Sequence, residues 1–288
     1  MGATTNMATV VTHQKESFEA AYGLDQNPYG MPDRKITDGQ EPRDKRILNL
    51  GGGESNDLWF LTDRNLVVNM DYAWSGLAAG ARHGVRGVQG DMNAASCLPF
   101  SDRTFDLIVC KDILEHLMEP IQVLREAKRV LRDDGCIVIS VPNHFYWPIR
   151  TRMLFGKGIM WQGIFSKHGD EYQEWNYMHI RFFTYSGFRR FLSCVGLVPQ
   201  KFYWDFGSLA HYYNPDMWLE PQLWKRQRDI PLSKRSKMGV FVIRPLWTIL
   251  NIIFPRFLRR LIVSLSPGLL CSSFYVRCMK EKQQIGAI

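Results

Sequence analysis

The sequence predicts an α/β fold built on a mostly parallel β-sheet, and two observations lead to this prediction. From Arg46 onward, short apolar runs alternate with segments whose apolar residues recur at helical spacing, a pattern typical of βαβ units. The first apolar run leads directly into Gly51-Gly52-Gly53, a turn that lets the backbone approach a ligand closely. A chain of 288 residues with 45% hydrophobic content can bury one such domain and carry a large insertion.

Seven strands are expected from this pattern, together with two well-marked helices. One helix covers residues 121–131 and is expected to end at Asp133-Asp134-Gly135. The other begins at Thr184, a residue type that caps helices, and ends at Gly196. The strands are expected at residues 46–50, 66–70, 87–90, 105–110, 136–141, 197–206 and 273–279.

Charge is distributed unevenly along the chain. The net charge of +8 combines −4 over residues 1–150 with +12 over residues 151–288. Between the last two strands, six basic residues precede short apolar runs bounded by prolines, as in helices that lie on an anionic membrane surface. An insertion packed on the sheet explains them as well, and a dimer or nucleic-acid surface is weaker because no nucleic-acid-binding motif is present. The six are Lys225, Arg226, Arg228, Lys234, Arg235 and Lys237.

The composition also bears on the compartment. No window approaches the roughly 20 uncharged apolar residues of a spanning helix, and the N-terminal segment lacks the apolar core of a signal peptide. The six cysteines include no Cys-x-x-Cys pair, which favours free thiols in a reducing compartment. We therefore expect a cytoplasmic protein that could also lie peripherally at the membrane.

Glycines and acidic residues follow the first three predicted strands. Gly51-Gly52-Gly53 is expected to open a helix whose free N–H groups favour an anionic group, although a tight turn without a ligand would look similar. Asp71 ends the second strand, where a carboxylate can accept both hydroxyls of a ribose, or can simply cap a helix. Gly90-Asp91-Met92 ends the third strand. Because parallel strands end at one edge of the sheet, the three segments are expected to line one site.

In their order along the chain, these segments and the motifs after them resemble class I S-adenosylmethionine-dependent methyltransferases of the ubiquinone/menaquinone-methylating type. The resemblance covers residues 46–206 and is weaker in the last strand. It implies a Rossmann-like, seven-stranded sheet whose last strand is antiparallel, with a large insertion before that strand. The further motifs are Leu98-Pro99-Phe100, Phe105-Asp106-Leu107-Ile108, Leu114-Glu115-His116-Leu117, Leu131 to Gly135, Val141-Pro142-Asn143 and His179-Ile180-Arg181-Phe182-Phe183-Thr184.

The resemblance implies S-adenosylmethionine as the cofactor and assigns residues to its parts. Gly51 and Gly53 would flank the methionine moiety, and Asp71 would hold the ribose hydroxyls. Asp91 would receive the adenine amino group, and the backbone of Met92 would contact the ring. The sulfonium side would be lined by Lys111 and Asp112, and the set is completed by Asn49 and Gly52.

Two positions depart from the family pattern. The family usually has Asp or Glu where Asn49 stands, and a third glycine where Ser55 stands. These departures keep an alternative open, namely an inactive S-adenosylmethionine-binding sensor or scaffold. A nicotinamide dehydrogenase is disfavoured, because its Gly-x-Gly-x-x-Gly motif would require glycine in place of Asn56.

Histidines are the candidates for a catalytic base. Methyl transfer is an in-line displacement, so a base is needed only when the nucleophile arrives protonated. The candidates are His116, His144 and His179. His116 ranks first, because it follows the fourth strand at the edge where α/β folds bind ligands. His116 and His179 are the predicted catalytic residues. A structural role for His116 explains the sequence equally well.

A metal-binding role is also suggested by resemblance. Asp112, Glu115 and His116 occupy positions similar to a metal-binding set in ubiquinone-pathway O-methyltransferases. Because Leu-Glu-His-Leu is widespread in relatives without metal, no metal site is predicted from the sequence.

Taken in order, the sequence predicts four parts. They are an N-terminal arm (1–42), a methyltransferase domain (43–206), a basic and apolar insertion (207–270), and the last strand with its tail (271–288). The predicted activity is methyl transfer to a small-molecule or lipid-linked acceptor, with O-methylation favoured. Nucleic acid is an unlikely partner on this composition, and an anionic membrane surface is the other predicted contact.

Overall fold

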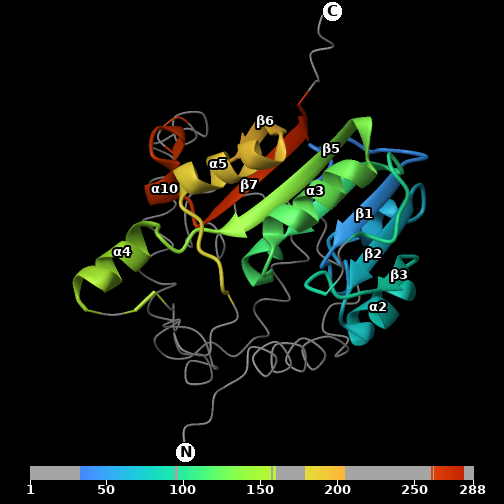
Figure 1. Cartoon of the computed structure of the whole chain (residues 1–288), viewed down its shortest axis with the longest axis horizontal. Coiled ribbons are helices and arrows are strands. Elements are labelled where there is room, and N and C mark those ends of the chain that lie inside the picture. Colours follow the sequence, from blue (N-terminus) through green and yellow to red (C-terminus); the bar gives the residue numbers. More distant parts are fainter. Residues whose placement is uncertain are drawn as a thin grey trace, which may run out of the picture.

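Seven strands form one sheet in the computed structural model, which describes residues 33–94, 97–156, 158–159, 179–204, 261 and 263–281. Their order across the sheet is β3-β2-β1-β4-β5-β7-β6 (Figure 1). β7 runs antiparallel to both of its neighbours, and β1 to β5 are paired in parallel. The mixed, Rossmann-like sheet with an antiparallel last strand is therefore confirmed. The strands are β1 (Arg46–Leu50), β2 (Leu66–Asp71), β3 (Arg86–Gln89), β4 (Phe105–Lys111), β5 (Leu131–Pro142), β6 (Leu197–Tyr203) and β7 (Ser273–Lys280).

The described helices are short. Helices α3 and α5 lie side by side across one face of the sheet, while α2 lies by β2 and β3 (Figure 1). The helices are α2 (Trp74–Ala81), α3 (Pro120–Val130), α4 (Trp147–Leu154), α5 (Tyr185–Val195) and α10 (Pro267–Leu270), with 3₁₀ turns η1 (Trp59–Leu61) and η2 (Leu114–His116).

Strand alternation gives the sheet two buried faces. In β4, Ile108 and Cys110 pack toward α3 and α5, whereas Leu107 and Val109 pack toward the opposite face. The first core contains Phe188 of α5, which is fully buried. Lys111 follows Val109 at period two, so its side chain extends to the face opposite α3 and α5.

The strand order reverses between β1 and β4. The chain proceeds outward from β1 through β2 to β3 and then returns to β4 on the other side of β1. Connections on the two sides of such a reversal diverge, and open α/β sheets bind their ligands there. The glycine turn after β1 and the segment after β4 therefore lie at the expected site.

The sequence predictions for α5 are confirmed at both ends. Thr184 is the N-cap, and its side-chain oxygen accepts a hydrogen bond from the Gly187 N–H at 3.1 Å. Gly196 closes the helix in the left-handed region, at φ 72°. Phe188, Leu192 and Val195 form the buried face of the helix. Capping residues and apolar spacing were sufficient to define this element.

Two local predictions are wrong. α3 ends at Val130, and β5 already begins at Leu131, so Asp133-Asp134-Gly135 lies inside the strand and does not follow the helix. The pairing explains this, because Leu131 pairs with Phe105 and the register then shifts before Cys136 pairs with Leu107. The glycine turn does not open an α-helix either, because it is followed by turns and by η1.

Part of the N-terminal arm packs against the sheet. Ile36 is fully buried in the second core, and its carbonyl oxygen accepts a hydrogen bond from Arg277 of β7 at 3.0 Å. Residues 1–32 lie outside the described part, as does most of the basic insertion, of which residues 261 and 263–270 are described. Within the described residues, no helix is long and apolar enough to cross a membrane.

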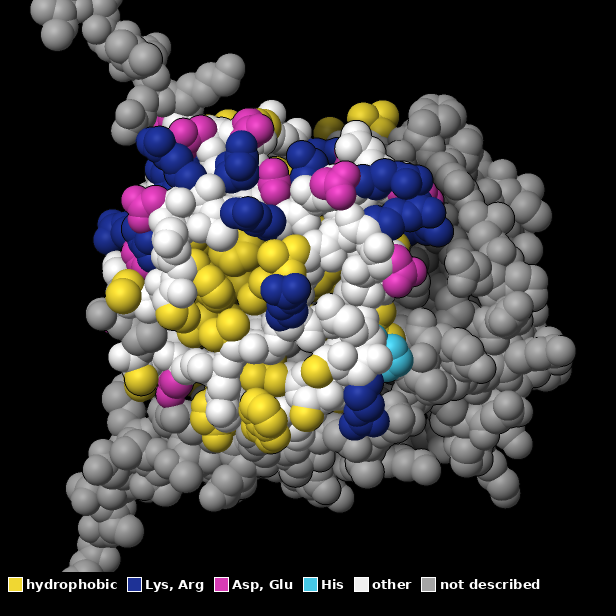
Figure 2. Space-filling model, turned by 90° about the vertical axis from the view of Figure 1, so that its right-hand side faces the viewer, with side chains coloured by type: hydrophobic (Ala, Val, Ile, Leu, Met, Phe, Trp, Pro, Cys, Tyr) yellow, Lys and Arg dark blue, Asp and Glu magenta, His cyan; other side chains and the backbone are white. Residues whose placement is uncertain are grey.

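One end of the sheet is the short strand β3. It has four residues, and Arg86 is exposed on it. Short edge strands that carry charge resist pairing with other sheets. On the side of the molecule that is at the right in Figure 1, a group of hydrophobic side chains lies below a band of basic and acidic ones (Figure 2).

Candidate active site

The glycine turn after β1 is held in a defined shape by side chains of β2. Gly51 and Gly53 have φ angles of 67° and 53°, which glycine adopts without strain. Asn69 accepts a hydrogen bond from the Gly52 N–H at 3.2 Å and donates one to the Gly53 carbonyl at 2.7 Å. The turn is thus organised by the protein itself.

Asp71 ends β2 and fixes the same turn. Its Oδ2 accepts a hydrogen bond from the Gly53 N–H at 2.7 Å, and its Oδ1 accepts one from the Ala73 N–H at 2.8 Å. The residue is 8% exposed. Each carboxylate oxygen has more than one acceptor site, so these backbone bonds still permit a ribose hydroxyl to donate to Asp71.

The segment after β3 continues this edge. The Gly90 N–H donates to the Asp71 carbonyl at 2.9 Å, which places Asp91 next to the end of β2. Asp91 is half-buried and accepts a hydrogen bond from the Asn93 N–H at 2.9 Å. The Met92 side chain packs into the first core.

The two departures from the family pattern contact each other. Asn49 donates to the Ser55 hydroxyl at 3.0 Å, and both residues are buried. A Cβ at Gly52 would lie 2.1 Å from Asn49 Nδ2, so glycine is required above this pair. Ser55 adopts φ 52°, the conformation that glycine favours, and its bond to Asn49 stabilises the residue there. Asn49 therefore supports the turn from beneath.

Close backbone packing fixes the turn from two further sides. A Cβ at Gly76 of α2 would lie 2.8 Å from the Gly53 carbonyl carbon. A Cβ at Gly51 would lie 2.5 Å from Ile113 Cδ1, in the segment after β4. The turn therefore contacts the β4 segment at the reversal of the sheet order.

Lys111 is held by an ion-pair network on the face of the sheet opposite α3 and α5. Its Nζ lies 2.8 Å from both Asp33 Oδ2 and Asp57 Oδ2, and the Tyr275 hydroxyl donates to Asp33 at 2.9 Å. Burial disfavours charge at Asp33, but Lys111 more than offsets it and holds the Asp33 pKa below its usual value. Burial likewise lowers the Lys111 pKa, and the two aspartates reverse this to a net increase. Lys111 thus joins the N-terminal segment to the turn region.

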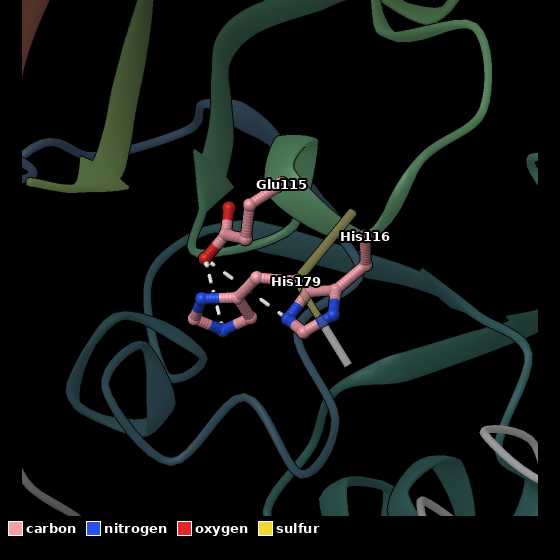
Figure 3. A group of neighbouring side chains, drawn as sticks. All are labelled: Glu115, His116 and His179. Carbon is pink, nitrogen blue, oxygen red and sulfur yellow. Dashed lines mark ion pairs between the residues drawn. The ribbon is translucent and has the colours of Figure 1, made fainter. Parts of the chain in front are cut away.

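A second cluster lies after β4, where Glu115, His116 and His179 converge (Figure 3). Their nearest ligand-type atoms all lie within 4.8 Å of one another. Glu115 Oε1 is 4.0 Å from His116 Nε2 and 3.9 Å from His179 Nε2. The backbone holds the arrangement, because the N–H groups of Ile180 and Arg181 both donate to the Glu115 carbonyl, at 2.9 and 3.1 Å.

The electrostatics of this cluster are unusual. Burial, with the nearby charge of Asp112 second, raises the pKa of Glu115 to about 8. His144 lies behind the cluster, with Nε2 2.9 Å from His179 Nδ1. Burial and the neighbouring histidines lower the pKa of His144 to about 4 and that of His179 to about 3. His144 and His179 are therefore neutral at pH 7.

The structure brings most of the predicted site residues to one edge of the sheet. Sequence reasoning selected His116 and His179 and, by resemblance, grouped Glu115 with His116, but it did not place His179 and His144 beside them. It also missed the Asp33–Lys111–Asp57 network. Neither group has a local sequence signal, because each depends on segments that only the fold brings together.

The site and sheet have the organisation of a class I methyltransferase, and residues 48–139 match the family model described as a methyltransferase domain. This match supports a class I, S-adenosylmethionine-dependent methyltransferase domain in this part of the chain. The family resemblance drawn from the sequence is thereby confirmed.

Curated relatives match parts of the same region. The chain is 30% identical over 111 residues to a demethylmenaquinone methyltransferase of Renibacterium salmoninarum, which covers 37% of this chain and 46% of that protein. It is 38% identical over 52 residues to the uncharacterized methyltransferase YcgJ of Bacillus subtilis, covering 18% and 21%. The chain thus spans less than half the length of these relatives.

Solved structures of similar proteins include two methyltransferase-like chains. The YcgJ structure has a TM-score of 0.46 and 16% identity, covering 86% of this chain and 97% of that one. A SAM-dependent methyltransferase from Aquifex aeolicus has a TM-score of 0.44 and 15% identity, covering 66% and 92%.

The Lys111 network yields a prediction about stability. In Lys111→Met, Asp33 and Asp57 lose their shared cation inside the protein, so the free energy of unfolding should fall by about 3 kcal/mol. Urea denaturation measures this fall. Arg64→Met is the control, because its ion pair with Glu41 is exposed and should contribute about 1 kcal/mol or less. Equal losses for the two variants would contradict a structural role for the network.

Proposed function

We propose that the protein is an S-adenosylmethionine-dependent methyltransferase whose acceptor is a small or lipid-linked molecule, with O-methylation favoured. The observation that carries this proposal is the pre-formed glycine turn, bonded to Asp71 and lying in contact with the segment that leads to the histidine cluster. The glycine turn with Asp71 suits the cofactor, and the histidine cluster at the same edge of the sheet suits an acceptor.

The cofactor side would be built from the residues assigned by resemblance. Gly51, Gly52 and Gly53 would lie along the methionine moiety, while Asp71 would accept hydrogen bonds from the ribose. Asp91 and the Met92 backbone would contact the adenine. Asp112 would lie at the sulfonium side, supported by the hydrogen bond that its Oδ1 accepts from Ser140 at 2.8 Å.

Lys111 has a smaller part in this proposal than the sequence suggested. Two of its three ammonium donors are used by Asp33 and Asp57. We therefore propose that Lys111 supports the site through those ion pairs, while Asn49 supports it through Ser55.

The acceptor side explains why oxygen is favoured. Transfer of a methyl group to oxygen breaks the sulfonium S–C bond and forms a C–O bond, and a hydroxyl acceptor must also lose its proton. A neutral imidazole can take that proton directly, or can ligate a metal ion that lowers the pKa of the hydroxyl. His116 and His179 are the candidate residues, with side chains 11% and 17% exposed.

The cofactor assignment is tested by Asp71→Ala. Each lost hydrogen bond to a charged group costs about 1.5–3 kcal/mol, so affinity for S-adenosylmethionine should fall at least about tenfold. Isothermal titration calorimetry measures it, with circular dichroism to verify folding. Asp63→Ala removes an exposed carboxylate before β2 and should leave the affinity unchanged. Unchanged affinity in a folded Asp71→Ala variant would refute the assignment.

His116→Ala is the complementary variant in the same experiment. Production of S-adenosylhomocysteine with a panel of hydroxyl acceptors should fall on the order of 10²-fold or more, while affinity for the cofactor is retained. Cofactor binding by the unaltered protein, without turnover of any acceptor, would instead favour a sensor or scaffold.

The lipid-linked alternative follows from the basic residues between β6 and β7, which lie outside the described part. Each Lys or Arg near an anionic lipid surface contributes about 1 kcal/mol of attraction. The intact protein should therefore sediment with anionic vesicles at low salt and release them at high salt. A variant with all six basic residues changed to Gln should stay in solution. If the intact protein also stays in solution, peripheral membrane contact is wrong.

A further inference from the structure

We propose that Glu115, His116 and His179 bind one divalent transition-metal ion, with Zn²⁺ the best match, and that His144 orients His179 for this role. The site itself is inferred from the geometry of these side chains. Its use on an acceptor rests on the methyltransferase activity proposed above.

The first observation is the environment of the Glu115 carboxylate. Glu115 is 1% exposed, and among the described residues neither of its side-chain oxygens has a hydrogen-bond partner. A buried carboxylate without partners is costly, and most buried charges are paired or coordinate a metal. The two groups nearest to Oε1 in the cluster are imidazole nitrogens, which are also common metal ligands. A shared cation would supply the missing partner of the Glu115 carboxylate, with the two imidazoles as its further ligands.

The distances fit a group that contracts around an ion. Ligand atoms bound at about 2.0–2.2 Å to tetrahedral zinc lie roughly 3.3–3.6 Å apart. The carboxylate oxygen lies 3.9 and 4.0 Å from the two imidazole nitrogens. All three ligand atoms lie within 4.8 Å of one another, so the two rings would have to move toward the carboxylate and toward each other to bind one ion. Figure 3 shows both imidazoles beside the same carboxylate oxygen.

His144 supplies the orientation that metal-binding histidines require. A ligating imidazole commonly donates its other ring N–H to a nearby acceptor, which fixes the tautomer. His179 Nδ1 lies 2.9 Å from His144 Nε2. When Nδ1 donates in this contact, the lone pair of His179 lies on Nε2, the atom that faces Glu115. His144 is thus a positioning residue and not a ligand.

The donor types select the metal. Two imidazole nitrogens and one carboxylate oxygen suit zinc and other late divalent transition metals better than Mg²⁺ or Ca²⁺, which prefer oxygen ligands. Three protein ligands leave a fourth position for water or an acceptor oxygen, as in catalytic zinc sites. A hydroxyl bound there would be more acidic, which agrees with O-methylation.

This ligand set differs from the one that resemblance suggests. Asp112 is bonded to the Ser140 hydroxyl and is not a member of the converging group. His179, which comes from the segment before α5, takes its place. Variants of Asp112 and of His179 therefore distinguish the two ligand sets.

The test is calorimetric titration of Zn²⁺ into the full-length, chelator-stripped protein, in a Cys97→Ser/Cys194→Ser background that removes the two exposed thiols. One equivalent should bind. Glu115→Gln and His179→Ala should each weaken binding at least about 100-fold, and His144→Ala about 10- to 100-fold, as expected for an orienting partner. Titration with Co²⁺ should give the visible absorption of a four- or five-coordinate site, lost in His179→Ala.

Two controls make the outcome decisive. His83 lies between α2 and β3, and its imidazole stacks on Trp59. His83→Ala removes a histidine that is not part of the proposed metal site and should leave Zn²⁺ affinity unchanged. Asp112→Asn should weaken Zn²⁺ binding less than His179→Ala. Absence of stoichiometric binding, or equal losses in His83→Ala and His179→Ala, would overturn the proposal. If Zn²⁺ does not bind but S-adenosylmethionine does, the metal site alone is wrong.

Discussion

The Asp71 carboxylate joins the ends of the first two strands through hydrogen bonds that it accepts from Gly53 and Ala73. Without this anchor, three consecutive glycines would have the largest conformational freedom in the chain at the point where order is most needed. Asn69 reinforces the same turn from β2. Cofactor binding at this proposed site would then require little further ordering of the backbone, which is the benefit of a pre-organised site.

The order of the strands determines what lies next to this anchored turn. Because β4 returns beside β1, the turn contacts Ile113, and the residues after it carry Glu115 and His116. The Glu115 carbonyl accepts hydrogen bonds from the N–H groups of Ile180 and Arg181, which places His179 in the same cluster. The proposed cofactor side and the proposed acceptor side are therefore linked by a few backbone contacts at one edge of the sheet.

Much of this fold was predictable because its signals are local. The apolar runs located all seven strands, and Thr184 with Gly196 defined α5, because capping and period depend on neighbouring residues. The start of β5 was not predictable, because the register shift opposite β4 decides it. The helix expected after the glycine turn failed because Ser55 and the residues after it form turns, with the Ser55 N–H bonded to the Gly52 carbonyl at 2.7 Å.

The candidate site also has a part that the sequence predicts and a part that it does not. The glycine turn, Asp71 and Asp91 follow predicted strands, and their proximity follows from parallel pairing. Asn49 and Lys111 were assigned to the cofactor by their positions, but the structure gives them partners in Ser55 and in Asp33 with Asp57. The directions of the Asn49 and Lys111 side chains decide what these residues contact. Those directions depend on partners that the sequence alone does not identify.

Hydrogen–deuterium exchange with and without S-adenosylmethionine tests most directly whether this anchored edge binds the cofactor. Saturating cofactor should slow amide exchange in residues 51–55, 71–73 and 90–93, the three segments that meet at the carboxyl ends of β1, β2 and β3. The amides of β6, at the far end of the sheet, should exchange unchanged. Unaltered exchange in all three segments, or slowing confined to other parts of the chain, would contradict the proposed cofactor site.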